Sequence, residues 1–230
     1  MISYQIISTG SQGNATVIEN SILIDCGVPF KALYDNYKDL RLVLLTHIHK
    51  DHFNNTTIKR LAKERPTLRF GCCPWLVQPL IDCGVQKKNI DVYSFDKMYS
   101  YGICNIIPVY LKHNVPNCGY KLHFSTGKMI YATDCNNLNG ITAPHYDLYL
   151  IEANYEDEAI KERIRKKKEL GIYPYEINVL KNHLSKKKCD DFIINNADSR
   201  SRFIYMHQHD DSKDKEVFDN EISNSEDIAI

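Results

Sequence analysis

The stretch that decides the fold is Thr46-His47-Ile48-His49-Lys50-Asp51-His52. It lies at the end of an apolar run, residues 40–46, which predicts a buried strand, and it precedes a helix expected over residues 54–65. If the chain is extended through residues 47–49, His47 and His49 point to the same side, and the turn that follows aims Asp51 and His52 at a second point close by. Imidazole and carboxylate groups together suit zinc, and also manganese or iron. A solvated, histidine-rich turn is the alternative interpretation.

The composition is that of an ordinary globular protein. The chain has 230 residues, 29 Lys and Arg against 29 Asp and Glu, and a formal net charge of zero, which excludes a uniformly basic nucleic-acid coat. Its apolar runs are far shorter than the roughly 18–20 residues that a membrane span needs, and its first residues do not form a secretory signal. We therefore expect a cytoplasmic protein with no membrane partner, whose eight cysteines are free thiols packed in or near the core.

Strand-like segments dominate residues 3–24 and 90–152, and helical patterns fall between and after them. The helices are expected over residues 29–37, 54–65, 74–83, 155–170 and 185–197, and a last strand over residues 202–206. This order predicts an α/β sandwich of two sheets with helices on the outside. We expect one domain over residues 1–210, followed by a polar, acidic tail over residues 211–230.

The H-x-H-x-D-H string resembles the signature of the metallo-β-lactamase superfamily, and the likeness extends over roughly residues 3–210. The resemblance implies a four-layer αββα sandwich. It also implies a dinuclear metal centre, with two divalent ions, Zn²⁺ or alternatively Mn²⁺. Asp25 matches an early aspartate of the family, which supports the metal loop rather than binding metal itself.

The resemblance assigns a full ligand set to the chain. One metal would be bound by His47, His49 and His113, the other by Asp51, His52 and His207, and Asp134 would be shared. His209 is a rival to His207 as the last ligand, and the offset from the preceding strand favours His207. His123 and His145 are expected to lie outside the site.

A closer resemblance is carried by Ser8-Thr9-Gly10-Ser11-Gln12-Gly13-Asn14, which looks like the S-x-G-S-x-G-N opening of the YycJ/WalJ-like branch. That branch is similar to tRNase Z and to phage phosphodiesterases that destroy cyclic-nucleotide defence signals. The segment Asn182-His183-Leu184-Ser185 resembles a G-H-L-S motif whose histidine contacts phosphate and donates a proton. By this likeness the catalytic residues are His183, Asp51 and Glu152, with Glu152 orienting or tuning His183.

The predicted activity is phosphodiester hydrolysis by a hydroxide held between two metals about 3.5–4 Å apart. The first candidate is a nuclease or exonuclease on nucleic acid, and the alternative is a phosphodiesterase of cyclic mononucleotides. A metallohydrolase of another ester class and a non-catalytic metal-binding protein are further alternatives. The sequence leaves open a homodimer.

Two surface features bear on the substrate. Basic residues in 161–168 and 186–188 could line a phosphate-binding rim, or could be a solvated helix face. Tyr155, Tyr173 and Tyr175 could stack a base, or could simply pack.

Overall fold

The computed structural model describes residues 1–208, which form two six-stranded sheets. The strands of the first sheet are, in spatial order, β1 (Tyr4–Ser8), β2 (Ala15–Ile18), β3 (Ile22–Ile24), β4 (Leu42–Leu44), β5 (Arg69–Cys72) and β6 (Ile90–Val92). Those of the second are β12 (Arg202–Met206), β11 (Leu148–Glu152), β10 (Gly127–Ala132), β9 (Asn117–Phe124), β8 (Asn105–Leu111) and β7 (Tyr99–Ser100).

Each sheet is antiparallel on one side and parallel on the other. In the first sheet β1, β2 and β3 are antiparallel, and β3 to β6 are parallel. In the second sheet β7 to β10 are antiparallel, and β10, β11 and β12 are parallel. Every residue of β4 and of β11 is buried, because these parallel strands are covered on both faces of their sheets. Strands in such positions have nearly continuous apolar sequences.

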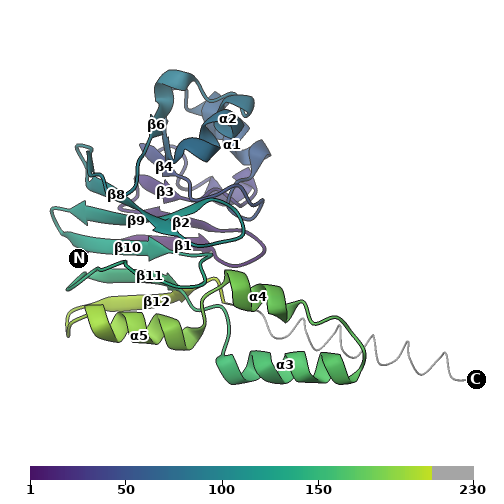
Figure 1. Cartoon of the computed structure of the whole chain (residues 1–230). Coiled ribbons are helices and arrows are strands. Elements are labelled where there is room, and N and C mark those ends of the chain that lie inside the picture. The colour runs from purple at the N-terminus through teal and green to yellow at the C-terminus, as the bar shows by residue number, and fades with distance from the viewer. Residues whose placement is uncertain (209–230) are drawn as a thin grey trace, which may run out of the picture.

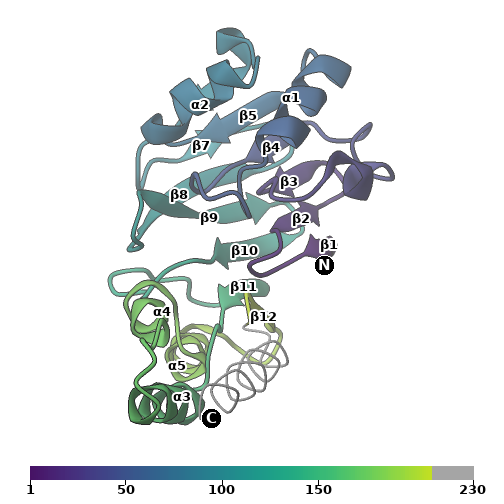
Figure 2. The ribbon, with the colours of Figure 1, turned by 90° about the vertical axis from the view of Figure 1, so that its right-hand side faces the viewer.

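Helices cover the outer face of each sheet, so the molecule has four layers (Figures 1 and 2). The helical elements are η1 (Phe30–Leu33), α1 (Asn55–Glu64), η2 (Pro74–Leu76), α2 (Val77–Asp82), η3 (Lys87–Asn89), α3 (Asp157–Glu169), α4 (Glu176–Asn182) and α5 (Lys186–Asn196). One apolar cluster joins α1 and α2 to the first sheet, a second fills the space between the sheets, and a third joins α5 to the second sheet. The predicted αββα sandwich is therefore confirmed.

Two local features differ from the sequence-based expectations. The helix expected over residues 29–37 is a single 3₁₀ turn, η1, and α4 was not expected. The residues of α4 follow Pro174 and show little apolar periodicity, and α4 is held by contacts with distant parts of the chain. All eight cysteines are free and buried, as predicted.

Some expectations fall outside the described part of the chain. They are the boundary at residue 210, the tail of residues 211–230 and the alternative ligand His209. Within residues 1–208, no helix combines the length and the apolar character needed to cross a membrane.

Candidate metal centre

The predicted site residues come together at one edge of the two sheets, where several strands end. The His47–His52 loop follows β4, and His113, Asp134 and His207 follow β8, β10 and β12. Glu152 is the last residue of β11, and His183 lies between α4 and α5. Because the carboxyl ends of parallel strands meet at one edge of a sheet, side chains far apart in sequence converge there.

The first group of potential ligands consists of His47, His49 and His113, whose ring nitrogens lie within 4.8 Å of one another. His49 Nδ1 is 3.1 Å from His47 Nε2 and 3.3 Å from His113 Nε2. Tetrahedral ligands at 2.0–2.1 Å from a zinc ion are about 3.3–3.5 Å apart. The two separations measured from His49 Nδ1 are therefore close to those between neighbouring ligands of one such ion.

The second group consists of Asp51, His52, Asp134 and His207. His52 Nε2 is 2.9 Å from Asp134 Oδ2, and Asp51 Oδ2 is 3.5 Å from both His52 Nε2 and His207 Nε2. The other oxygen, Asp134 Oδ1, is 3.5 Å from His207 Nε2 and 3.9 Å from His113 Nε2. Asp134 thus lies between the two groups, where a bridging carboxylate would be needed.

Two buried polar atoms of this centre lack a hydrogen-bond partner among the described residues and are suited to binding a metal ion. Within residues 1–208, Asp134 Oδ2 and His207 Nε2 are buried and form no hydrogen bond of acceptable geometry. Buried polar atoms without a partner are costly, and a bound cation removes that cost. The donor set of imidazole and carboxylate suits Zn²⁺ and also Mn²⁺.

Asp25 supports the loop from behind, as expected from its position after β3. His52 Nδ1 donates to Asp25 Oδ2 at 2.6 Å, which leaves His52 Nε2 facing the second group. The backbone N–H and the hydroxyl of Thr46 donate to Asp25 Oδ1 at 3.0 and 2.9 Å. Asp25 and Asp134 both have positive φ, at 59° and 57°, which bends the chain sharply where β3 and β10 end.

Three asparagines orient ligands that sequence reasoning did not connect with them. Asn14 Nδ2 lies 2.8 Å from His52 Nε2 and donates to the Asp51 carbonyl at 3.2 Å. Asn154 Nδ2 donates to the His207 carbonyl at 2.8 Å, and the Asn182 carbonyl accepts from His113 Nδ1 at 2.9 Å. Asn14 lies in the S-x-G-S-x-G-N opening, a signal that could have found it. The Asn182 contact is made by the backbone and has no side-chain signal.

The imidazoles have different electrostatic surroundings. Burial is the main influence on His113 and lowers its pKa to about 4, so this ring is neutral and available to a metal. Burial also lowers the pKa of His207, but the Asp134 carboxylate and the other acidic neighbours outweigh burial and raise it to about 9. The carboxylates of the second group thus attract positive charge.

His183 and Glu152 form a tight pair at the rim of the centre. His183 Nδ1 donates to Glu152 Oε1 at 2.6 Å, and the Cys135 N–H donates to Glu152 Oε2 at 2.8 Å. Burial lowers the pKa of His183, but the hydrogen bond and the charge of Glu152 outweigh burial and raise it. With Asp134 and His207 these two residues make a third group that could hold a cation. Glu152 and His183 already form a hydrogen bond with each other, which distinguishes this third group from the first two.

Several solved structures match this chain over most of its length. YhfI from Bacillus subtilis, described as a metallo-β-lactamase fold protein, is 14% identical, has a TM-score of 0.68, and is matched over 90% of this chain and 86% of its own. The short form of human tRNase Z is 15% identical, with a TM-score of 0.64 over 92% of this chain and 94% of its own. The chain has the metallo-β-lactamase fold.

A third structure with the metallo-β-lactamase fold of this chain is Zn²⁺-bound PqqB from Methylobacterium extorquens. It is 10% identical, with a TM-score of 0.63 over 91% of this chain and 89% of its own. No protein-family model and no curated protein sequence matches the chain. At identities this low, the structural similarity establishes the fold of the chain but not its activity. The activity has to be inferred from the residues of the site.

The remaining predicted residues have separate surroundings. His123 Nε2 lies 2.7 Å from the Tyr146 hydroxyl, and the exposed His145 pairs with Asp198 at 3.4 Å. The basic side chains of α3 and α5 mostly pair with acidic neighbours on the same helix: Lys161 with Glu158, Arg165 and Lys166 with Glu162, Lys186 with Asp190, and Lys187 with Asp191. This pairing favours the interpretation of a solvated helix face over that of a phosphate-binding rim.

We expect Gly27→Ala to destabilise the metal loop of the metallo-β-lactamase fold. A Cβ at this position would lie 1.7 Å from the Asp51 carbonyl oxygen, and backbone cannot move aside as a side chain can. The loss should be about 3 kcal/mol in the free energy of unfolding, at the upper end for overpacking. Urea denaturation with a chelator present measures it. Gly102→Ala is the matched control, because its Cβ would meet no atom within 4 Å. Equal stabilities of the two variants would contradict this packing.

Asp25→Ala should weaken metal binding without removing a ligand. His52 would lose the acceptor that fixes its Nδ1–H, and removing such a partner typically costs about 10- to 100-fold in metal affinity. Competition with a chromophoric chelator gives the affinity. An unchanged affinity would show that His52 does not depend on Asp25.

Proposed function

We propose that the protein is a metal-dependent phosphodiesterase of nucleotide substrates, with the seven residues described above as ligands of two divalent metals and His183 as proton donor. The observation that carries this proposal is the pairing of His183 with Glu152 beside two complete groups of potential ligands. A hydrolase that only had to activate water would need the metals alone. A buried carboxylate that orients a further histidine adds a group suited to protonating a leaving oxygen.

Two divalent ions bound here would supply a water of lowered pKa and would neutralise charge on phosphoryl oxygens. The chain's own residues do the rest. Asp25 and the Asn182 carbonyl accept the Nδ1–H of His52 and His113, so each ring presents Nε2 to the centre. Glu152 accepts the Nδ1–H of His183 and leaves the opposite edge of that ring for a leaving-group oxygen. The His183 ring stacks on His207 at 5.2 Å between centroids, which places it over the second ligand group.

The names of the fold neighbours support phosphodiester hydrolysis as a general reaction class, without indicating a substrate for this chain. Besides the human tRNase Z they include a protein described as a diphosphatase of the PhnP family. A nucleic-acid strand is our first candidate substrate, in the manner of a nuclease or exonuclease. Tyr173, which is 68% exposed and precedes α4, is our candidate for stacking an unpaired base of such a strand.

A cyclic mononucleotide is the second candidate, and the ion pairs of α3 and α5 favour it. Lysines and arginines that already face glutamate or aspartate attract a polyanion weakly. The zero net charge acts in the same direction. A substrate with a single phosphodiester needs no such basic surface, because the two metals neutralise its charge.

A hydrolysis screen tests the proposal. Chelated protein is supplied with Zn²⁺ or Mn²⁺ and offered linear DNA, RNA, 2′,3′- and 3′,5′-cyclic nucleotides, and bis(p-nitrophenyl) phosphate. We expect hydrolysis of the nitrophenyl diester and of at least one nucleotide, abolished by chelator and restored by metal. For a nucleic-acid substrate, KM should rise steeply with salt because counterions are released, whereas a cyclic nucleotide should show a shallow dependence. Inactivity on every diester with either metal would refute the proposal.

A further inference from the structure

The C-terminal end of α4 leads directly into His183, but α4 is only seven residues long. Helices this short are marginal by themselves, and the last four carbonyl groups of a helix have no partner within it. Two of these carbonyls, those of Lys181 and Asn182, accept hydrogen bonds from side chains on loops of the second sheet. The position of this helix end, and of His183 after it, therefore depends on groups outside α4.

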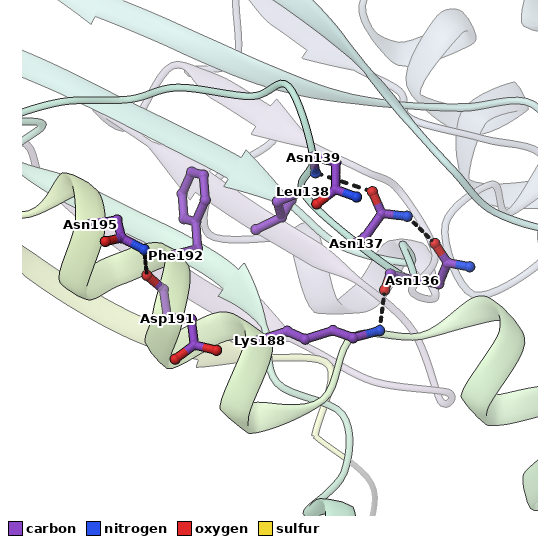
Figure 3. A pocket seen from close by; sticks show the side chains of 8 residues that line it. All are labelled: Asn136, Asn137, Leu138, Asn139, Lys188, Asp191, Phe192 and Asn195. Atoms are coloured by element: carbon purple, nitrogen blue, oxygen red, sulfur yellow. Dashed lines mark hydrogen bonds between the residues drawn. The ribbon is translucent and has the colours of Figure 1, made fainter.

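Asn136 is one of these groups, and three hydrogen bonds join it to different elements. Its backbone N–H donates to the carbonyl of Lys112, directly after β8, at 3.1 Å. Its carbonyl accepts from Lys188 Nζ at 2.8 Å, and Figure 3, drawn at the pocket between α5 and this loop, shows the Lys188 side chain reaching it. Its Nδ2 donates to the Lys181 carbonyl at 2.8 Å. Because the backbone of Asn136 is held on both sides, its amide is a fixed anchor for α4.

The segment that contains Asn136 also holds His183 from another side. Asn136 follows the potential ligand Asp134 by two residues. Between them, the Cys135 N–H donates to Glu152 Oε2 at 2.8 Å, and Glu152 Oε1 accepts from His183 Nδ1 at 2.6 Å. One short segment after β10 thus acts on the ring of His183 through Glu152 and on its backbone through α4.

We propose that Asn136 is a positioning residue of the metal centre, acting through the C-terminal end of α4. By holding the Lys181 carbonyl, it keeps His183 over the second ligand group. It also keeps the Asn182 carbonyl, the next along the chain, against His113 Nδ1. The effect on His183 rests on the proposed function, whereas the effect on His113 concerns metal binding alone.

Asn136→Leu tests the effect on His183, because leucine keeps the branched shape of asparagine and cannot donate to α4. With both metals saturating, it should lower hydrolysis of a nucleotide diester about 10- to 100-fold, the usual loss when a partner that orients a site residue is removed. Hydrolysis of bis(p-nitrophenyl) phosphate should fall much less, because its leaving group needs no proton. Asn139→Leu is the matched control, an exposed asparagine in the same loop, and both of its rates should stay unchanged.

The double variant Asn136→Leu/His183→Ala separates positioning from a general loss of structure. If Asn136 acts through His183, the double variant should hydrolyse the nucleotide diester at the rate of His183→Ala, because two changes to one interaction are not additive. Multiplied losses in the double variant, or equal losses of Asn136→Leu on both diesters, would overturn the positioning of His183.

Metal affinity tests the effect on His113 and needs no activity. Competition with a chromophoric chelator should show that Asn136→Leu binds one equivalent of metal about 3- to 10-fold more weakly, the net worth of one hydrogen bond, and that Asn139→Leu is unchanged. If this shift is found but the unsubstituted protein hydrolyses no diester, the proposed function fails and the positioning of His113 stands. An unchanged affinity would overturn the effect on His113.

Discussion

Replacing His183 with alanine should leave the metal content unchanged and lower the rate of hydrolysis of a nucleotide diester by about 10²- to 10⁴-fold, the usual worth of general acid catalysis. His183 Nδ1 bonds to Glu152, and neither residue belongs to the two main ligand groups. The loss should shrink for bis(p-nitrophenyl) phosphate, because nitrophenolate leaves readily without a proton. Elemental analysis and steady-state kinetics on both substrates measure these effects.

His207→Ala is the contrasting variant. It removes a potential ligand of the second group, so metal content and activity on both substrates should fall together. Glu152→Gln should behave as a mild form of His183→Ala, with a smaller rate loss, because it disturbs the orientation of the ring and leaves the proton donor in place. A loss of metal in His183→Ala, or equal losses on both substrates, would show that His183 is a ligand or a binding contact.

Asp134→Ala should have the largest effect on the centre itself. Its Oδ2 is 2.9 Å from His52 Nε2 and its Oδ1 is 3.5 Å from His207 Nε2, so one carboxylate contacts both sides of the second group. Without it, two buried imidazoles lose their shared negative partner, and positive charges close together repel. We expect metal content to fall below that of the unsubstituted protein and hydrolysis of every diester to fall below detection.

Asp134→Asn is the matched control for shape. The amide keeps one oxygen that can bind a metal but loses the charge, so it should retain more metal than alanine and still have low activity. Far-ultraviolet circular dichroism confirms that each variant is folded. Full metal occupancy in Asp134→Ala would contradict the bridging position of this carboxylate.

Most of the fold could be predicted from the sequence, because the strongest sequence signals come from short stretches of neighbouring residues. The buried run before His47 and the apolar residues of β11 are long enough to specify parallel strands, and the turn at Ser125 and Thr126 joins β9 to β10 as its composition indicates. The helix α4 lacked such a signal. It depends on packing against α3 and on its contacts with the loops at Asn136 and His113, which no local pattern shows.

The candidate site shows the same difference between residues with a local sequence signal and residues that act through long-range contacts. The potential ligands were visible as residue types placed after strands, and the structure brings all seven together with His183 and Glu152. The groups that orient them were less visible. Asn154 contacts His207 across 53 positions of sequence, and the Asn182 backbone contacts His113 across 69. Contacts of that range follow from the register of whole sheets, and asparagine is common in loops for other reasons.

Stepwise metal titration of the chelated protein, with hydrolysis of bis(p-nitrophenyl) phosphate followed at each addition, tests the central claim most directly. Asp134 belongs to the second ligand group and its Oδ1 is 3.9 Å from His113 Nε2 of the first, so we predict that activity rises with added Zn²⁺ or Mn²⁺ and reaches its plateau at two equivalents per chain. A plateau at one equivalent, or the absence of hydrolysis at any amount of either metal, would contradict a two-metal phosphodiesterase.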